Sequence, residues 1–420
     1  MASNPSRILP DPVCETPAPP SRARRGIGNW VLSHLSRETS SGRFIPEMDG
    51  LRFVSVATII FVHLNGYLSV KSPAYYSFPE TSWVNQVVPV GYRAVEMFFM
   101  ISGFILGLPF AAHYIKDAPA VKLDKYYLRR LTRLEPPYMA AVLLLFLGAI
   151  YVQGQSARDL YPHLGASFVY LHNAIYGYFS PVIGVGWTLE IEVQFYLLVP
   201  WLTPLFAIRN RFARRSVFLA LIITILALQS LFLHHDSPRA SLSILAYIQF
   251  FLLGLLLADI FLTDWRESPQ KNLYWDIVAL AGWPIVPFLA RSPALTHWLF
   301  PGLLLSLYCS TFRGRLVNRI FVYPWITAIG GMCYSIYLLH FEGISIVARF
   351  TKRLSEGAPY WIHLWFQFAL VGVIVVLLCS PYFVFLEKPC MRRDWPQRLR
   401  SYLRSVISPR PQVVETETAD

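Results

Sequence analysis

Ten long apolar stretches constrain the fold of this chain more than any other feature of its sequence. Most have roughly 17 to 25 residues, the length that an α-helix needs to cross the hydrocarbon core of a bilayer. Hydrophobic residues fill 55% of the 420 positions and charged residues 15%, too apolar a balance for a soluble protein. The sequence therefore predicts an all-α, polytopic transmembrane bundle of about ten helices, near residues 51–69, 93–112, 134–153, 187–206, 216–233, 241–262, 274–289, 295–310, 324–347 and 361–386.

The two ends of the chain differ in composition from this apolar body. Residues 1–43 are rich in Pro, Ser and Arg, and the last residues are polar, so neither end buries enough apolar surface to fold alone. We expect a disordered basic cytoplasmic tail at 1–43, a ten-helix membrane domain at 44–388, and a basic, then polar, cytoplasmic tail at 389–420.

The distribution of Lys and Arg predicts the orientation of the chain, because cytoplasmic loops are enriched in these residues. With the N-terminus inside, 29 of the 37 basic residues fall on the cytoplasmic side. This predicts a multi-pass protein with both termini in the cytoplasm, placed in the plasma (inner) membrane. The net charge of +12 then reflects cationic flanks lying against anionic lipid headgroups, and no sequence module indicates binding to nucleic acid.

The five cysteines show no spacing typical of a zinc site or a redox motif. They fall in predicted helices or on the predicted cytoplasmic side, so we expect neither a disulfide framework nor a metal site. These cysteines are Cys14, Cys309, Cys333, Cys379 and Cys390.

The segment EMDGLRFVSVATIIFVHL, residues 47–64, places a histidine inside an apolar run. An ionisable residue within a span is costly, which makes His63 a functional candidate. The eleven-residue step from Arg52 brings His63 to within roughly 20° of the same helix face and about 16 Å deeper, and Asp49 falls near that face too. The alternative is a satisfied core histidine and an arginine whose side chain reaches to the membrane surface.

Two further segments carry polar residues at the start of predicted spans. VEMFFMISGF, residues 95–104, contains Glu96 and the small pair Ser102 and Gly103; close helix packing is the alternative for that pair. DKYYLRRLTRLEPPY, residues 124–138, sets two arginines three residues apart on one helix face. Such a pair suits a phosphate, although it also fits a plain cytoplasmic flank. The two arginines are Arg130 and Arg133.

Carboxylates and aromatic residues mark the last two segments of interest. GVGWTLEIEVQFYLLVPWL, residues 184–202, holds Glu190 and Glu192, which project roughly 200° apart on a helix, so at most one can face a given pocket. CYSIYLLHF, residues 333–341, sets Tyr337 and His340 on one helix face. This second histidine either lines a polar pocket or forms a hydrogen bond between helices.

Taken together, these motifs resemble acyltransferase family 3, a family of integral membrane acyltransferases that transfer acetyl or other acyl groups to sugars and related acceptors. The resemblance covers roughly residues 44 to 390, with five motifs in the family's order. The segments that carry it are MDGLRFVSVATIIFVH, VEMFFMISGF, RRLTRLEPPY, WTLEIEVQFYLLVP and YSIYLLH. In the second motif, Glu96 stands where an aspartate is common in the family, and the chain is expected to lack the hydrolase-like domain that some members carry.

The resemblance implies that His63 is the catalytic histidine, that Arg52 supports it, and that Arg130 and Arg133 bind acyl-CoA at the cytoplasmic face. Glu192 matches the family's glutamate in the fourth motif, which makes it the third catalytic candidate. The remaining candidates for the substrate pocket are Asp49, Glu96, Ser102, Trp187, Tyr337 and His340.

The expected reaction is transfer of an acyl group, with acetyl-CoA as the expected donor, to a hydroxyl of a carbohydrate, a lipid-linked sugar or a small molecule. Acyl-CoA enters as a substrate, and no permanently bound cofactor is expected. His63 acts as general base or as a covalent acyl carrier, and Asp49 or Glu192 fixes its tautomer or holds Arg52. The alternative functions are a proton-coupled transporter or flippase that uses the same buried residues, and a non-catalytic scaffold.

Overall fold

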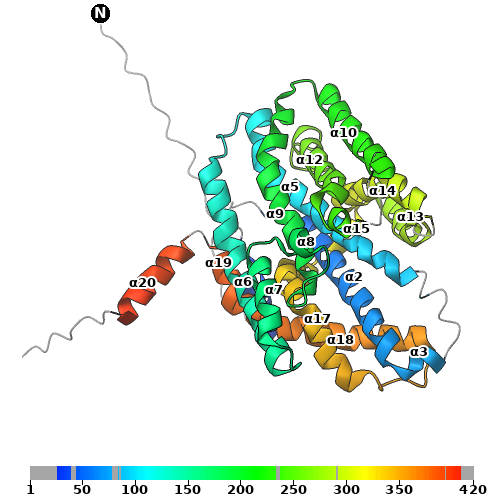
Figure 1. Cartoon of the computed structure of the whole chain (residues 1–420). Coiled ribbons are helices and arrows are strands. Elements are labelled where there is room, and N and C mark those ends of the chain that lie inside the picture. The colour runs from blue at the N-terminus through cyan, green and yellow to red at the C-terminus, as the bar shows by residue number, and fades with distance from the viewer. Residues whose placement is uncertain are drawn as a thin grey trace, which may run out of the picture.

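The computed structural model describes residues 26–38, 44–77, 84, 87–232, 237–289, 292–392 and 394–407, and all regular structure in these residues is helical (Figure 1). This confirms the predicted all-α class. The helices of the N-terminal half are α1 (Ile27–Leu35), α2 (Pro46–Lys71), α3 (Pro73–Ser77), η2 (Val88–Arg93), α5 (Ala94–Lys116), α6 (Leu123–Tyr151), α7 (Ala157–Phe168), α8 (His172–Tyr176), η3 (Gly184–Gly186), α9 (Trp187–Leu202) and η4 (Thr203–Ala207). Those of the C-terminal half are α10 (Arg211–Phe232), α11 (Pro238–Ser241), η5 (Ile244–Ala246), α12 (Ile248–Thr263), α13 (Leu273–Leu289), α14 (Pro293–Arg313), α15 (Leu316–Phe321), α16 (Pro324–Gly331), α17 (Cys333–Thr351), α18 (Tyr360–Tyr382), η6 (Phe383–Glu387), α19 (Lys388–Cys390) and α20 (Trp395–Ile407).

Each of the ten predicted apolar stretches coincides with a helix or a helix pair, but ten membrane spans are not confirmed. Among the described residues, five helices are long and apolar enough to cross a bilayer: α2, α5 with η2, α6, α10 and α18 with its C-terminal extension. The pair α16 and α17, bent by 74°, makes a sixth candidate. Helices α12 and α13 are apolar but have only 16 and 17 residues. The chain is therefore a multi-pass helical membrane protein with at least five candidate spans.

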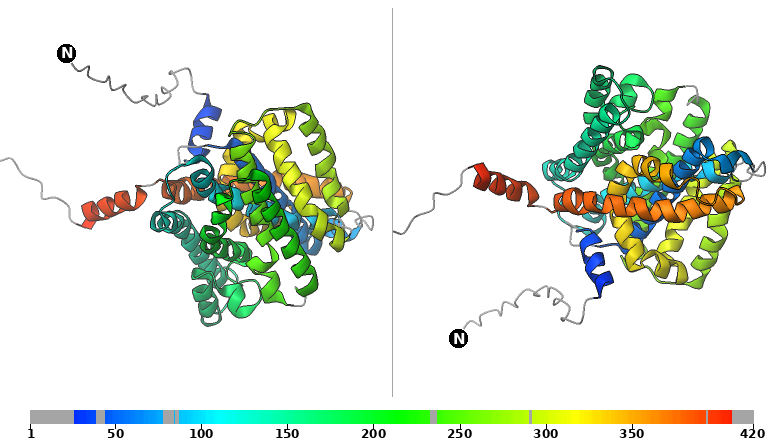
Figure 2. Two further views of the ribbon diagram at one scale, coloured as in Figure 1. Left: turned by 90° about the horizontal axis from the view of Figure 1, so that it is seen from above. Right: turned by 90° about the horizontal axis from the view of Figure 1, so that it is seen from below.

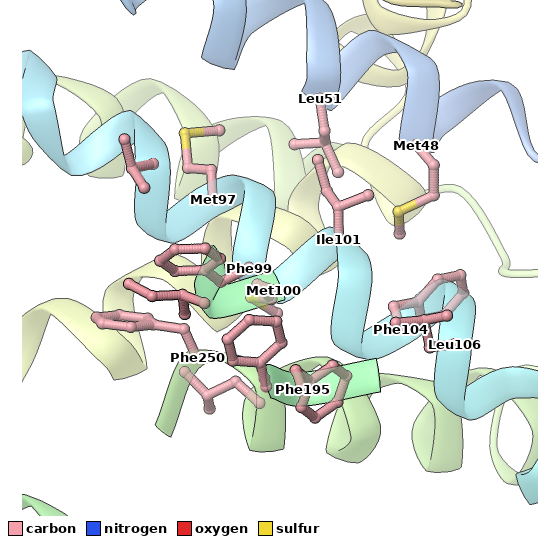
Figure 3. Close-up of a cluster of buried hydrophobic side chains, with 14 of the residues drawn as sticks. Met48, Leu51, Met97, Phe99, Met100, Ile101, Phe104, Leu106, Phe195 and Phe250 are labelled. Carbon is pink, nitrogen blue, oxygen red and sulfur yellow. The ribbon is translucent and has the colours of Figure 1, made fainter. Parts of the chain in front are cut away.

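Helix α5 lies at the centre of the larger hydrophobic core, between α2 on one side and α9 and α12 on the other (Figure 3). Its crossing with α12 is close because each helix contributes a glycine. A Cβ atom on Gly103 would lie 2.2 Å from the backbone oxygen of Phe251, and one on Gly254 would lie 2.3 Å from that of Met100. Small residues allow such close contact between helices in a membrane. Gly103 therefore serves helix packing, the alternative considered for it from the sequence.

A second close crossing joins α2 to α16, just before the bend that separates α16 from α17. A Cβ atom on Gly330 of α16 would lie 1.8 Å from the backbone oxygen of Asp49. At the end of the preceding helix α15, the backbone oxygen of Phe321 would lie 2.3 Å from a Cβ atom on Gly50. The contact fixes the start of α2 against the broken helix. Broken helices in membrane proteins commonly bring their ends to polar sites, and α17 begins here at Cys333.

A buried ion cluster joins α10 to α12. The carboxylate of Asp259, which is fully buried, pairs with Arg214 and with Arg215, and Arg215 also donates to Asp264 at 2.8 Å. Hydrogen bonding from Arg215 is the largest cause that lowers the pKa of Asp264. These arginines, which the sequence places in a basic flank, thus have carboxylate partners.

The N-terminal segment expected to be disordered contains helix α1, which projects from the bundle near the start of α2 (Figure 2). Lys388 donates to the backbone oxygens of Ser33 and His34, and Arg392 forms a bidentate pair with Glu38. These bonds explain how so short a segment becomes ordered, because they attach it to α19 and to the residues that follow α19. The rest of 1–43, apart from 26–38, and the part of the C-terminal tail after residue 407 lie outside the described residues.

Candidate active site

Two cavities lie among the helices, and most of the residues singled out from the sequence line one or the other. We name the first the arginine cavity; its charged lining residues are Arg37, Arg52, Arg130, Arg133, Glu192 and Glu387. We name the second the histidine cavity; its lining includes His63, Tyr67, Tyr92, Trp187, Phe341 and Glu342. Their volumes are about 130 Å³ and about 800 Å³. Val95 and Tyr337 line both.

Two of the four guanidinium groups in the arginine cavity share one carboxylate. Asp49, fully buried near the start of α2, accepts from Nη1 of Arg52 at 2.5 Å and pairs with Nε of Arg37 at 2.7 Å. Asp49 therefore holds Arg52, one of the two roles considered for it from the sequence. Burying this carboxylate is tolerable because two cations face it.

The other two guanidinium groups come from α6 and have no salt bridge to a carboxylate among the described residues. Arg130 lies over the rings of Tyr126 and Tyr196, at 5.7 and 6.0 Å from their centroids, and its buried Nε has no hydrogen-bond partner. Arg133 lines the cavity one turn further on. Guanidinium donors that face a cavity without carboxylate partners are suited to an anion such as a phosphate.

Glu190 and Glu192 project to different places, as their spacing on a helix predicts. Glu192 lines the arginine cavity and accepts from the hydroxyl of Ser102 at 2.5 Å. Glu190 instead accepts from the backbone N–H of Asn173 at 2.9 Å, at the start of α8. Ser102 therefore belongs to the polar wall of the cavity, whereas its neighbour Gly103 packs against α12.

Sequence reasoning missed two charged residues of the arginine cavity. Arg37 lies in the segment that was expected to be disordered from its composition. Glu387 follows the last apolar stretch, in a π-helical turn, and accepts from the backbone N–H and the hydroxyl of Ser335 at 3.0 and 2.5 Å. Single π-helical turns are frequent at functional sites. A carboxylate next to an apolar span was the available signal for Glu387.

The histidine cavity is larger, and its wall is mainly apolar, with several aromatic side chains. His63 projects into it from the middle of α2, with Tyr92 and Phe341 in ring contact at 5.9 and 5.6 Å between centroids. Trp187, at the start of α9, contributes to the wall as expected from its place among the pocket candidates. Walls of apolar and aromatic side chains with a few polar groups are typical of sites that bind small molecules.

A hydrogen bond to a second histidine orients the ring of His63. Its Nδ1 lies 2.8 Å from Nε2 of His340, and Nδ1 of His340 lies 2.8 Å from the backbone oxygen of Tyr337. A carbonyl oxygen only accepts, so the Nδ1 atom of His340 carries the proton, and Nε2 of that neutral ring accepts. His63 must then donate from Nδ1, which leaves its Nε2 unprotonated and able to act as a base.

This arrangement corrects two details of the sequence interpretation. The group that fixes the tautomer of His63 is His340, and neither Asp49 nor Glu192 contacts the imidazole. Arg52 and His63 share a helix but line different cavities, and the ion-pair partner of Arg52 is Asp49. Their predicted position on one face of the helix therefore does not bring the two side chains into a common pocket.

Glu96 and the possible metal ligands lie apart from these two cavities. Glu96 is buried and accepts from Arg93 at 2.5 Å, and it lines neither the arginine cavity nor the histidine cavity. Within the described part of the chain, no group of three His, Cys, Asp or Glu side chains lies together to hold a metal ion. The four cysteines in that part are free thiols, and Cys14 lies outside it.

Comparison with curated proteins finds relatives along most of the chain. A protein of Staphylococcus aureus (strain COL) named "Putative O-acetyltransferase SACOL0978" is 26% identical over 396 residues, which are 87% of this chain and 61% of that protein. "O-acetyltransferase OatA" of Staphylococcus aureus (strain MRSA252) is 23% identical over 402 residues, with the same two shares. The chain thus spans about three fifths of the length of the curated relatives it matches.

Comparison with solved structures and family models gives two further findings. No solved structure shows significant similarity to the chain. The model of acyltransferase family 3, described as "Acyltransferase domain", matches residues 45–384, which include both cavities except Arg37 and Glu387. Because this match covers most of its length, the chain belongs to acyltransferase family 3.

Proposed function

We propose that the protein is an integral membrane O-acyltransferase that moves an acyl group from acyl-CoA to a hydroxyl of a carbohydrate or related acceptor. The observation that carries this proposal is the pair of adjoining cavities: one presents Arg130 and Arg133, which have no salt bridge within the described part of the chain, and the other presents an unprotonated imidazole nitrogen. An acyl transferase needs an anion site for the donor and a base for the acceptor. The names of the relatives favour acetyl as the acyl group.

The donor fits the arginine cavity. The phosphates of acyl-CoA are large and charged, so they remain at the mouth of the bundle, close to Arg130 and Arg133. The thioester arm is narrow and extends into a cavity of about 130 Å³. Glu192 and Ser102 then lie along the arm, where their polar groups are able to bond its amides.

The acceptor fits the histidine cavity, where His63 acts on it. Nε2 of His63 takes the proton of the acceptor hydroxyl as its oxygen attacks the thioester carbonyl. The carbon–sulfur bond then breaks, and CoA leaves as a thiolate that receives the proton held on Nε2 of His63, which restores the neutral imidazole. His340 keeps Nδ1 of His63 occupied as a donor, so Nε2 alone faces the reaction. The covalent route, in which Nε2 itself accepts the acyl group, uses the same atom.

The proposed orientation of the chain in the membrane follows from the distribution of its Lys and Arg residues. We propose ten spans, counting α9, α12, α13, α14 and the bent pair, with both termini in the cytoplasm and the arginine cavity open to the cytoplasm. Reporter fusions at Asp420 and at Ser69 should then report opposite sides of the membrane. Agreement between the two reporters would contradict this topology.

The test of function is direct. Purified protein in detergent, supplied with labelled acetyl-CoA and a panel of sugars, lipid-linked sugars and small alcohols, should release free CoA and label an acceptor. If it releases no CoA with any acceptor, yet moves protons or solute when placed in vesicles, it is a transporter and the proposal is wrong. The compound in this panel that becomes labelled identifies the class of the acceptor.

A further inference from the structure

We infer that Val95 and Tyr337 form a partition between the two cavities, and that this partition holds the acyl group and sets the longest acyl chain that is transferred. The inference rests on the proposed function and adds a specificity determinant to it. Val95 comes from α5 and Tyr337 from α17. Of the residues that the structure describes, these two line both cavities.

Tyr337 is held rigidly in this position. Its hydroxyl accepts from the hydroxyl of Thr188 at 2.8 Å and donates to the backbone oxygen of Val185 at 3.2 Å. Its ring meets the ring of Phe98 edge-on, with centroids 5.8 Å apart. A ring fixed at both ends does not give way to a longer substrate, because moving it breaks hydrogen bonds in a buried site.

The same residue also fixes the base. The backbone oxygen of Tyr337 accepts from His340, which in turn accepts from His63. The wall between the cavities and the orientation of the imidazole thus depend on one position of α17. The reacting carbonyl must therefore lie at this wall, since the donor occupies one cavity and the base faces the other.

Burial makes the partition tight. Val95 is 7% exposed and Tyr337 is 8% exposed, and what remains accessible on each lines the cavities. A small acyl group fits between them, whereas each added methylene meets the side chain of Val95 or the ring of Tyr337. A closely packed apolar pocket discriminates between chains that differ by one methylene by roughly 10- to 200-fold.

The experiment measures kcat/KM for acetyl-, propionyl-, butyryl- and hexanoyl-CoA with one acceptor. Val95→Ala should raise the butyryl-to-acetyl ratio by roughly 10-fold, because it removes two methyl groups from the partition. Val95→Leu should lower the propionyl-to-acetyl ratio. Tyr337→Phe keeps the ring but releases it from Thr188 and Val185, so the ratio should move in the same direction as in Val95→Ala, by less.

Matched controls come from each cavity separately. Ile105→Val removes one methylene from the wall of the arginine cavity and leaves the histidine cavity unchanged. Ile344→Val does the same to the histidine cavity alone. Both should keep the wild-type ratios. If the Val95 and Tyr337 variants change the ratios no more than these controls do, the partition has no role in specificity. A wild-type protein that transfers no acyl group from any donor removes the proposed function itself, and the partition with it.

Discussion

The arginine cavity and the histidine cavity adjoin each other but differ in nearly every physical property. The first is small and presents four guanidinium groups and two carboxylates; the second is about six times larger and mainly apolar, with His63 and Glu342 among its lining residues. The charge in the first is suited to a ligand that carries phosphate, whereas the second presents an imidazole among apolar side chains. Under the proposed function, this difference predicts that donor and acceptor bind in separate cavities and meet at the wall between them.

The largest effect should follow from removing the base. His63→Ala should lower the rate of acyl transfer by roughly 10²- to 10⁴-fold, the range of positioned acid–base groups, while the KM for acetyl-CoA stays within a few-fold. The matched control is His163→Ala, because His163 and His172 form another histidine pair, 2.9 Å apart, that lines neither cavity. Intact transfer in the His63 variant would show that the second cavity holds no base.

The next effect concerns the residue that orients the base. His340→Leu removes the acceptor for Nδ1 of His63, and we expect a loss of roughly 10- to 100-fold, as for other groups that orient a reacting ligand. His340→Gln offers a side-chain oxygen to the same N–H and should recover part of the rate. Equal losses in both variants would make His340 a packing residue, and the measurement is kcat with saturating donor and acceptor.

Replacing the residues proposed to bind the donor should change the KM for acetyl-CoA more than it changes kcat. Replacing Arg130 and Arg133 together by Gln should raise the KM for acetyl-CoA by about 10-fold or more, with kcat less affected, because their contacts are with a part of the donor that does not react. Arg129→Gln, an exposed neighbour on the same helix, is the control. Unchanged donor dependence in the double variant would return these arginines to the role of a basic membrane flank.

The smallest effect should come from the edge of the arginine cavity. Arg392→Glu breaks the pair with Glu38 that helps to dock the segment carrying Arg37, and exposed pairs of this kind contribute about 0.2–1 kcal/mol. Binding of acetyl-CoA, measured by calorimetry, should weaken by about five-fold at most. The double exchange Glu38→Arg with Arg392→Glu should restore it; a double variant as weak as the single one would rule out the pair as the cause.

The same pair gives a pH dependence with a definite sign. Its hydrogen bond from Arg392 lowers the pKa of Glu38 below the ordinary value of 4.5. A carboxyl with a lowered pKa in the folded state stabilises docking at neutral pH, and that contribution is lost as the pH falls through the lowered pKa. Docking of the N-terminal segment should therefore be insensitive to pH between 6 and 8.

Residues that were singled out separately, from different motifs, lie together around one cavity in the structure. Arg52, Ser102, Arg130, Glu192 and Tyr337, from five different helices, all line the arginine cavity. The same motifs failed where the partner of a side chain mattered. His63, for which Asp49 or Glu192 was the expected partner, pairs with His340 across the bundle. Position on a helix is readable from a motif, but contact with another helix is not.

The sequence by itself determined the long apolar helices and the relative directions of polar side chains on one helix, because both depend on hydrophobic length and on fixed helix geometry. Glu190 and Glu192 illustrate this, since their spacing alone predicted that they would face different surroundings. Only the tertiary structure decided which helices cross, through backbone contacts such as that of Gly103 with Phe251.

Those crossings, the break before α17 and the π-helical turn at Glu387 together divide the polar interior into two cavities. Each depends on packing between segments far apart in the chain. No pattern within one segment specifies that packing, because it results from many weak contacts acting together.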